Sequence, residues 1–188
     1  MSTEINPVVN IEEAEEQKTP SAPNRLKRVK LIVAYDGTNY HGWQVQPNGE
    51  TIEGVLNRTL SSLLGEKIIV TGASRTDAGV HSMGNVAVFD TKSRIPAEKI
   101  SYALNQRLPE DIVVQKSEEV PADFHPRHCD SRKTYEYRIL NREFPLPMYR
   151  NNTYFCYRKL DLEKMQQAAE YLRGEHDFKS FCATAAVV

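Results

Sequence analysis

An arginine and an aspartate stand two positions apart in the string GASRTDAGVH, residues 72–81. Asp77 is followed by Ala78 and Gly79, so its carboxylate is uncrowded and the backbone beside it can turn sharply or approach a ligand. Such a carboxylate can act as a nucleophile or a general base. Arg75 can pair with it, and its planar guanidinium can stack on a base or bind a phosphate. On spacing alone a solvated turn with a surface ion pair is the commoner explanation. The composition of the whole string favours a site.

Two apolar runs flank this loop and would position it. KIIVTG at 67–72 and NVAVFDT at 85–91 are both typical of strands. VKLIVAY at 29–35 and DIVVQKSEEV at 111–120 predict two more. The loop is therefore expected to join two strands of a four-stranded sheet.

Two helices are expected between these strands. Apolar residues recur at helical spacing over residues 52–64, with Thr51 placed as N-cap and Gly65 just past the end. A second helix can start at Pro96 and run through Leu108. The resulting order, β-α-β-β-α-β, is that of ferredoxin-like folds, an α+β class with an antiparallel sheet. Its two helices cover one sheet face, which leaves the other face, or the loops at its rim, for a large ligand such as RNA.

The pattern restarts in the last third of the chain. KTYEYRILN at 133–141 alternates like a strand, and NTYFCYR at 152–158 predicts a second. A helix follows, with Asp161 as cap and Gly174 as stop. A second unit of the same kind would still need more strands and a helix when the chain ends in CATAAVV, so we expect an incomplete second α+β domain. The expected parts are a disordered tail at 1–28, a domain at 29–122 and a partial domain at 123–188.

Charge and composition limit the function classes. The chain has 188 residues and a formal net charge of -1. Residues 1–24 carry five Glu and one Lys, a net of -4, which leaves +3 for the rest. A mildly basic folded part permits a nucleic-acid partner. Three widely spaced cysteines make a disulfide framework unexpected. The chain has neither an apolar run of membrane-spanning length nor a secretion signal, so we expect a cytoplasmic protein without membrane association.

The string RTDAGVH, with a strand on either side, resembles the signature loop of the tRNA pseudouridine synthase A family. The resemblance runs in the family's order from about residue 29 to residue 181. It includes AYDGTNYHGWQVQPNGETIEG, ALNQRLPEDIVV, DFHPRHCDSRKTYEYRILN and GEHDFKSF. It implies a cofactor-free isomerase that detaches uracil from its ribose and rejoins it through C5 instead of N1. The implied substrate is tRNA, modified in the anticodon stem-loop at positions 38 to 40, and the implied assembly is a homodimer.

The resemblance also implies roles for three residues. Asp77 matches the family's essential aspartate, and Arg75 matches the arginine that helps to extrude the target nucleotide. Extrusion is needed because a stacked, paired uridine hides the atoms that must react. Tyr135 matches the tyrosine that stacks on the flipped base, a contact that contributes on the order of 1 to 3 kcal/mol. From the sequence alone, a strand tyrosine packing across a sheet is an open alternative for Tyr135.

Two further alternatives concern a metal and the end of the chain. The string HPRHC offers His125, His128 and Cys129, but it has no paired motif that would complete a zinc site, so we expect no metal. Family members continue beyond the last residues seen here, so we expect a C-terminally truncated form. An RNA-binding fragment without turnover is then the alternative to an active isomerase.

Overall fold

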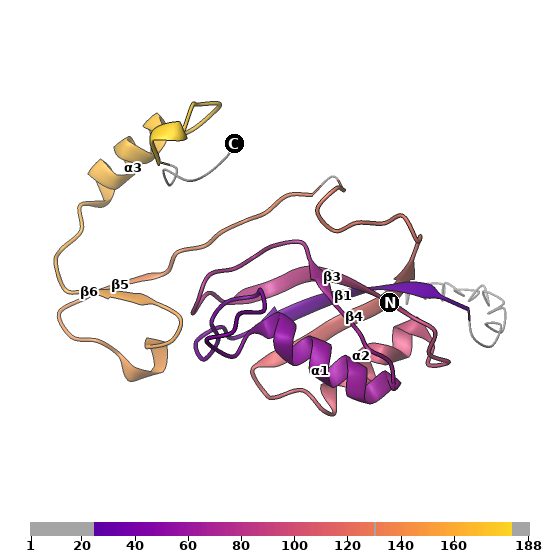
Figure 1. Cartoon of the computed structure of the whole chain (residues 1–188). Helices are drawn as coiled ribbons and strands as arrows, with labels where there is room; N and C mark the ends of the chain where they lie inside the picture. Colours follow the sequence, from indigo (N-terminus) through magenta and orange to yellow (C-terminus); the bar gives the residue numbers. More distant parts are fainter. Residues whose placement is uncertain (1–24, 130, 182–188) are drawn as a thin grey trace, which may run out of the picture. The chain divides into compact units, whose positions relative to one another are not determined.

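The computed structural model describes residues 25–129 and 131–181, which belong to two units (Figure 1). The first unit runs to Ser131 and the second begins at Arg132. Most of the expected tail and the terminal CATAAVV, with Cys182, lie outside the described residues. The expected division of the chain into domains stays a prediction.

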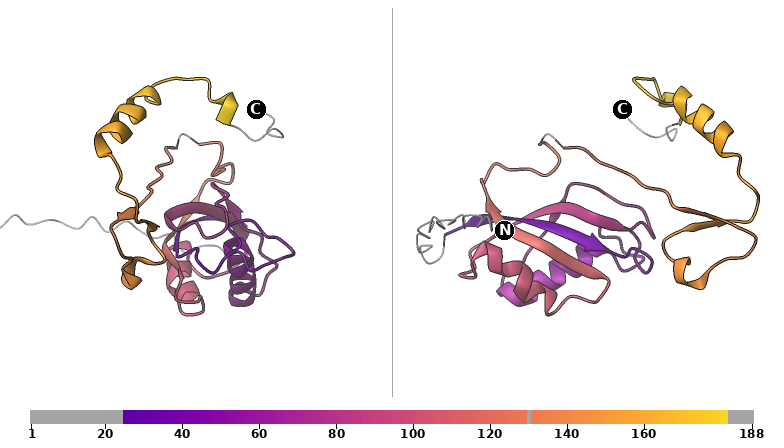
Figure 2. Two further views of the ribbon diagram at one scale, coloured as in Figure 1. Left: turned by 90° about the vertical axis from the view of Figure 1, so that its left-hand side faces the viewer. Right: turned by 180° about the vertical axis from the view of Figure 1, so that it is seen from behind.

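The first unit is a mixed α/β structure built on a four-stranded antiparallel sheet, which confirms the expected element types. Its sheet order is β2-β3-β1-β4. Figures 1 and 2 show both helices on the same face of this sheet. The elements are β1 (Lys27–Tyr35), α1 (Ile52–Leu64), β2 (Thr71–Gly72), β3 (Ser82–Thr91), α2 (Ala97–Asn105) and β4 (Ile112–Val120).

Alternation along the strands and helical spacing along α1 place the apolar residues in one core. Every second residue of β1 is buried. On α1 the buried residues lie along one side of the helix and are Ile52, Val55, Leu56 and Leu60. Each fully buried aliphatic side chain contributes about 1.5–3 kcal/mol to folding. The core between sheet and helices includes Val29, Leu31, Val33, Ile52, Leu56, Leu60, Ile100, Leu104, Ile112 and Val114.

The predicted caps of α1 are confirmed. The Thr51 side chain accepts a hydrogen bond from the Gly54 N–H, and Gly65 ends the helix with a φ of 68°. The second helix is shorter than predicted, because it ends at Asn105 and does not reach Leu108. The Asn105 side chain bonds both backbone groups of Val114 in β4, which ties the end of α2 to the sheet.

The strand predicted at 67–72 is mostly wrong, since only its last two residues pair with β3. The Ile68 N–H donates to Ser61 Oγ and the Val70 N–H donates to Asn57 Oδ1. Side chains of α1 therefore satisfy the backbone where a neighbouring strand would have done so. Ile68 and Val70 are still buried, which explains the strand-like pattern.

The sheet face opposite the helices is not fully open, contrary to expectation. Arg28 and Lys30 lie on that face, because they alternate with the buried residues of β1. Arg28 Nη1 donates to the Phe124 carbonyl at 3.1 Å, and Lys30 Nζ lies 5.8 Å from the centre of the Phe124 ring. Arg127 Nε donates to the Gly72 carbonyl of β2 at 2.8 Å. The segment after β4 therefore covers part of this face between β1 and β2.

The second unit contains β5 (Ile139–Asn141), β6 (Tyr154–Cys156), α3 (Leu162–Tyr171) and two 3-10 turns at Pro147–Tyr149 and Lys179–Phe181. The predicted strands at 133–141 and 152–158 are shorter than expected, because only three residues of each pair, in parallel. The Asp161 cap of α3 is confirmed by its bond from the Lys164 N–H. Among residues 131–181 none is buried. No helix in the described part of the chain has the length and apolar character needed to span a membrane.

Candidate functional site

Arg75 and Asp77 lie on one loop, residues 73–81, which leads from β2 to β3. Both side chains are exposed. Both residues are described by the structure, and no ion pair or hydrogen bond joins their side chains. The ion pair between Arg75 and Asp77 that the sequence suggested is therefore not seen. The carboxylate and the guanidinium are therefore presented to solvent on the same loop.

The loop leaves the sheet at Ser74, where a side chain replaces the strand ladder. The Ala73 N–H still donates to the Val86 carbonyl at 2.7 Å, as a strand residue would. At the next residue, the Ser74 N–H donates to Asn85 Oδ1 at 3.2 Å and Asn85 Nδ2 donates to the Ser74 carbonyl at 3.1 Å. Asn85 is buried in β3. Its amide thus binds both backbone groups of Ser74, directly before Arg75.

The centre of the loop is fixed at Thr76, between Arg75 and Asp77. The Trp43 N–H donates to the Thr76 carbonyl at 3.0 Å. The Tyr35 hydroxyl and Thr76 Oγ1 form a hydrogen bond of 2.8 Å in which either can donate. Burial raises the pKa of the Tyr35 hydroxyl above its ordinary value, so the group stays protonated at neutral pH. Backbone and side chain of Thr76 are therefore both held.

The return of the loop packs against residues 36–42. The Gly79 N–H donates to the Tyr40 carbonyl at 3.2 Å, and the Val80 N–H donates to the Asp77 carbonyl at 3.2 Å. The Tyr40 hydroxyl in turn donates to Asp111 Oδ1 at 2.5 Å. This chain of contacts fixes the backbone after Asp77 as well as before it.

His81 closes the loop against the turn that follows β1. His81 Nδ1 lies 3.2 Å from the Gly37 nitrogen and 3.0 Å from Asp36 Oδ1. The hydrogen bonds from Thr38 lower the pKa of Asp36 below its ordinary value, with the nearby His81 adding to the effect. Asp36 is therefore ionised at neutral pH and stabilises the turn beside the loop.

The two loops approach each other so closely that side chains are excluded between them. Gly42 has a φ of 83°, and a Cβ there would lie 2.4 Å from the Thr76 carbonyl oxygen. At Gly37 a Cβ would lie 2.1 Å from the Val80 carbonyl oxygen. Glycine is required at both positions for the observed packing.

Tyr135, the third predicted site residue, belongs to the second unit. It lies outside the three paired residues of β5, and its side chain is 71% exposed. The strand packing considered for it is therefore not seen. Arg75 and Asp77 share one loop, whereas Tyr135 comes from the other unit of the chain.

The motif HPRHC places two imidazole rings together. The ring centres of His125 and His128 are 4.3 Å apart. Among the described residues, no group of three His, Cys, Asp or Glu side chains is arranged to hold a metal ion. The guanidinium of Arg127, in the same motif, donates a hydrogen bond to the Gly72 carbonyl of β2.

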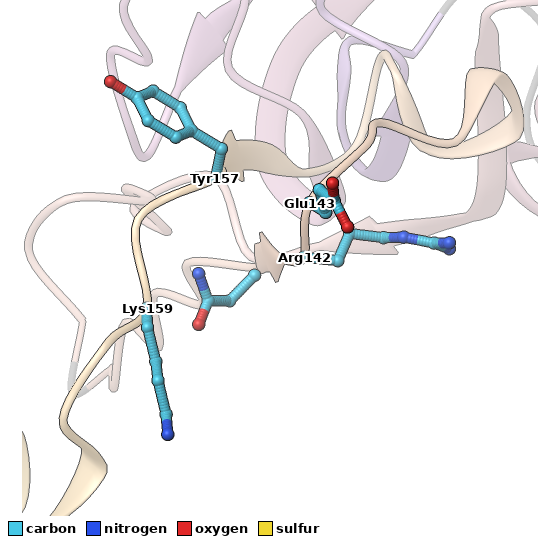
Figure 3. Close-up of a pocket in the computed structure, with 5 residues that line it drawn as sticks. Arg142, Glu143, Tyr157 and Lys159 are labelled. Carbon is cyan, nitrogen blue, oxygen red and sulfur yellow. The ribbon is translucent and has the colours of Figure 1, made fainter.

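A shallow pocket in the second unit does not form a comparable site. It is lined by Asn141, Arg142, Glu143, Tyr157 and Lys159. Figure 3 shows Arg142, Tyr157 and Lys159 extending in different directions. The Asn141 side chain bonds the backbone of three residues in its own unit, so it supports the fold of the β5–β6 region.

The sequence reasoning missed Asn85 and Tyr35 as supports of the loop. Both are polar groups at inward-facing positions of strands: Asn85 shares a side of β3 with Ala87 and Phe89, and Tyr35 follows the buried residues of β1. The available signal was a polar residue on the side of a strand whose other residues are buried, since a buried polar group needs a hydrogen-bond partner. Trp43 also supports the loop, because its N–H donates to the Thr76 carbonyl.

Comparison with known proteins identifies the family of the chain. Residues 31–128, slightly more than half of the chain, match the family described as tRNA pseudouridine synthase. The chain is 51% identical over 156 residues to tRNA pseudouridine synthase A of Acetivibrio thermocellus, covering 83% of this chain and 64% of that protein. It is 48% identical over 163 residues to the protein of the same name from Ruminiclostridium cellulolyticum, covering 87% and 66%. The chain thus spans just under two thirds of the length of these relatives. It belongs to the tRNA pseudouridine synthase family.

Proposed function

We propose that this chain is a tRNA pseudouridine synthase that catalyses the isomerisation of uridine to pseudouridine in the anticodon stem-loop of tRNA. The N1–C1′ bond of the target uridine breaks, the base turns, and a C5–C1′ bond forms. The C5 hydrogen leaves as a proton and N1 gains one, so no atom is added or lost. The reaction therefore needs no cofactor.

The observation that supports this function most is the exposed Asp77 carboxylate on a loop whose backbone is held on both sides. A reacting group must keep its geometry while the substrate is brought to it, and fixed positioning contributes several kcal/mol to catalysis. The hydrogen bonds at Thr76 and Gly79 supply that restraint. We assign Asp77 as the catalytic carboxylate.

Arg75 and Tyr135 are the proposed substrate-binding residues. Arg75 is exposed beside Asp77, where its guanidinium can bind phosphate or take the place of an extruded base. The exposed ring of Tyr135 is available for stacking on the flipped base. The names of the relatives support tRNA as the substrate.

The finer fold assignment and the assembly are part of the same proposal. The sheet order β2-β3-β1-β4 with two helices on one face supports a ferredoxin-like first unit. We further propose a homodimer that acts on tRNA in the cytoplasm, without membrane association.

Product analysis tests this function. The chain is incubated with a tRNA transcript, the RNA is digested, and pseudouridine is separated from uridine by chromatography. A second transcript with cytidine in place of every uridine at positions 38 to 40 of the anticodon stem-loop serves as the matched RNA. Pseudouridine from the first transcript alone is the expected result. No pseudouridine from a chain shown to be folded and to bind tRNA would overturn the activity and leave an RNA-binding fragment.

A further inference from the structure

We propose that Tyr35 and Asn85 are positioning residues that hold the 73–81 loop in its reactive shape before RNA binds. This inference rests on the proposed function of Asp77. Neither residue reaches solvent to a useful degree: Tyr35 is 5% exposed and Asn85 is 6% exposed. Each can act on a substrate only through the loop.

The two side chains hold the residues on either side of Arg75. Asn85 binds both backbone groups of Ser74, and Tyr35 binds the hydroxyl of Thr76. Arg75 therefore stands between two fixed residues, and Asp77 directly follows the second of them. The two side chains add to the restraint that backbone hydrogen bonds at Thr76 and Gly79 already give the loop.

These two side chains, the clamps, belong to paired residues of the sheet, on either side of a register shift between Val33 and Tyr35 in the β1–β3 ladder. Asn85 faces Val33 in the β1–β3 ladder, and Tyr35 is the last residue of β1, paired with both neighbouring strands. A site supported by strands is more rigid than one supported by loops. The clamps therefore transmit the rigidity of β1 and β3 to the loop.

The Tyr35 hydroxyl and both ends of the Asn85 amide make hydrogen bonds within the fold. A buried amide or hydroxyl without a partner is costly, so each residue is expected to be fully bonded. Removing the Tyr35 hydroxyl would leave Thr76 Oγ1 without this bond while keeping the ring that packs against Trp43, 6.0 Å between ring centres. Tyr35→Phe thus separates loop positioning from core packing.

Amide hydrogen exchange in the full chain tests the clamps without requiring turnover. In Asn85→Ala the Ser74 amide is expected to exchange about tenfold faster, because its acceptor is gone. In Tyr35→Phe and Thr76→Val the Trp43 amide, which donates to the Thr76 carbonyl, is expected to exchange faster. Thr76→Ser keeps the hydroxyl and should restore the parental rate. The matched control is Tyr102→Phe, which removes an exposed hydroxyl from α2.

Two exchange results would overturn the proposal. One is an unchanged rate at Ser74 and Trp43 in these variants. The other is an equal acceleration at Leu31 in the centre of β1, because that would report a general loss of stability rather than a freed loop.

Turnover of tRNA supplies the second readout. If the clamps position Asp77, Tyr35→Phe should lower kcat about tenfold, because the carboxylate is held less well for the reaction. A rise in KM with kcat unchanged would overturn the positioning role. A parent chain without turnover would refute the proposed function and the catalytic role with it, while the exchange rates would still decide whether the clamps hold the loop.

Discussion

Gly42 is one of two glycines that let the 36–42 turn approach the 73–81 loop closely. Gly42→Ala combines a positive φ with a Cβ 2.4 Å from the Thr76 carbonyl oxygen. We expect it to lower the free energy of unfolding by more than Gly65→Ala, which has a φ of 68° and open space around it. The left-handed conformation alone costs roughly 1–2 kcal/mol. Urea unfolding of both variants measures the difference, and equal losses would show that the contact with Thr76 is not tight.

Asp36 should make the stability of the first unit depend on pH. Its folded pKa lies below the ordinary value of 3.8 because Thr38 donates two hydrogen bonds to the carboxylate. A lowered folded pKa gives stabilisation that is present above the unfolded pKa and is lost as pH falls through the folded one. Asp36→Asn should therefore lose less stability than the parent between pH 5 and pH 2, as measured by thermal unfolding. Parallel pH curves for the two proteins would contradict this.

The first turn of α1 is hydrogen-bonded to the end of the turn that supports the loop, so its cap also matters to the site. The Ile52 N–H donates to the Gly42 carbonyl and the Glu53 N–H donates to the Trp43 carbonyl. Thr51→Ala should lower the free energy of unfolding by about 1 kcal/mol, because the Gly54 N–H loses its acceptor. Thr51→Ser keeps the hydroxyl and should cost only a few tenths of that. A serine variant as unstable as the alanine variant would assign the effect to the methyl group.

The elements that the sequence predicted well are those whose signals are local. The bounds of α1 follow from helical spacing, a threonine cap and a glycine stop. The strands at 67–72 and 133–141 were predicted too long, because alternation reports burial or a pattern but cannot report a pairing partner. The N–H groups of Ile68 and Val70 bond to α1 side chains, and β6 offers β5 only three residues.

The candidate site divides in the same way. Arg75 and Asp77 stand in one contiguous string, so the sequence could single them out. Tyr35 and Asn85 act on that string from 41 and 11 residues away in the chain, respectively. Such partners become visible only when strand register is known. The sequence could mark both as polar residues at buried strand positions, but not which loop residue each one bonds.

The backbone amides of the two units should differ sharply in their protection from hydrogen exchange. The first has a core of fully buried side chains, whereas no residue between 131 and 181 is buried. Because protection from exchange follows burial and packing, amides of α3 should exchange about a hundredfold faster than those of β1. Limited proteolysis should likewise cut the second unit first. Similar protection in both units would contradict the burial pattern described here.

The central claim is that the Asp77 carboxylate catalyses the isomerisation. It follows from membership of the tRNA pseudouridine synthase family and from the exposure of Asp77. The most direct measurement is tritium release from a tRNA transcript labelled at uridine C5, by the parent and by Asp77→Asn. Asp123→Asn, which changes an exposed aspartate outside the loop, serves as the matched control. We expect release by the parent and the control, and only background release by Asp77→Asn with an unchanged melting temperature. Release by Asp77→Asn at the parental rate would contradict the claim.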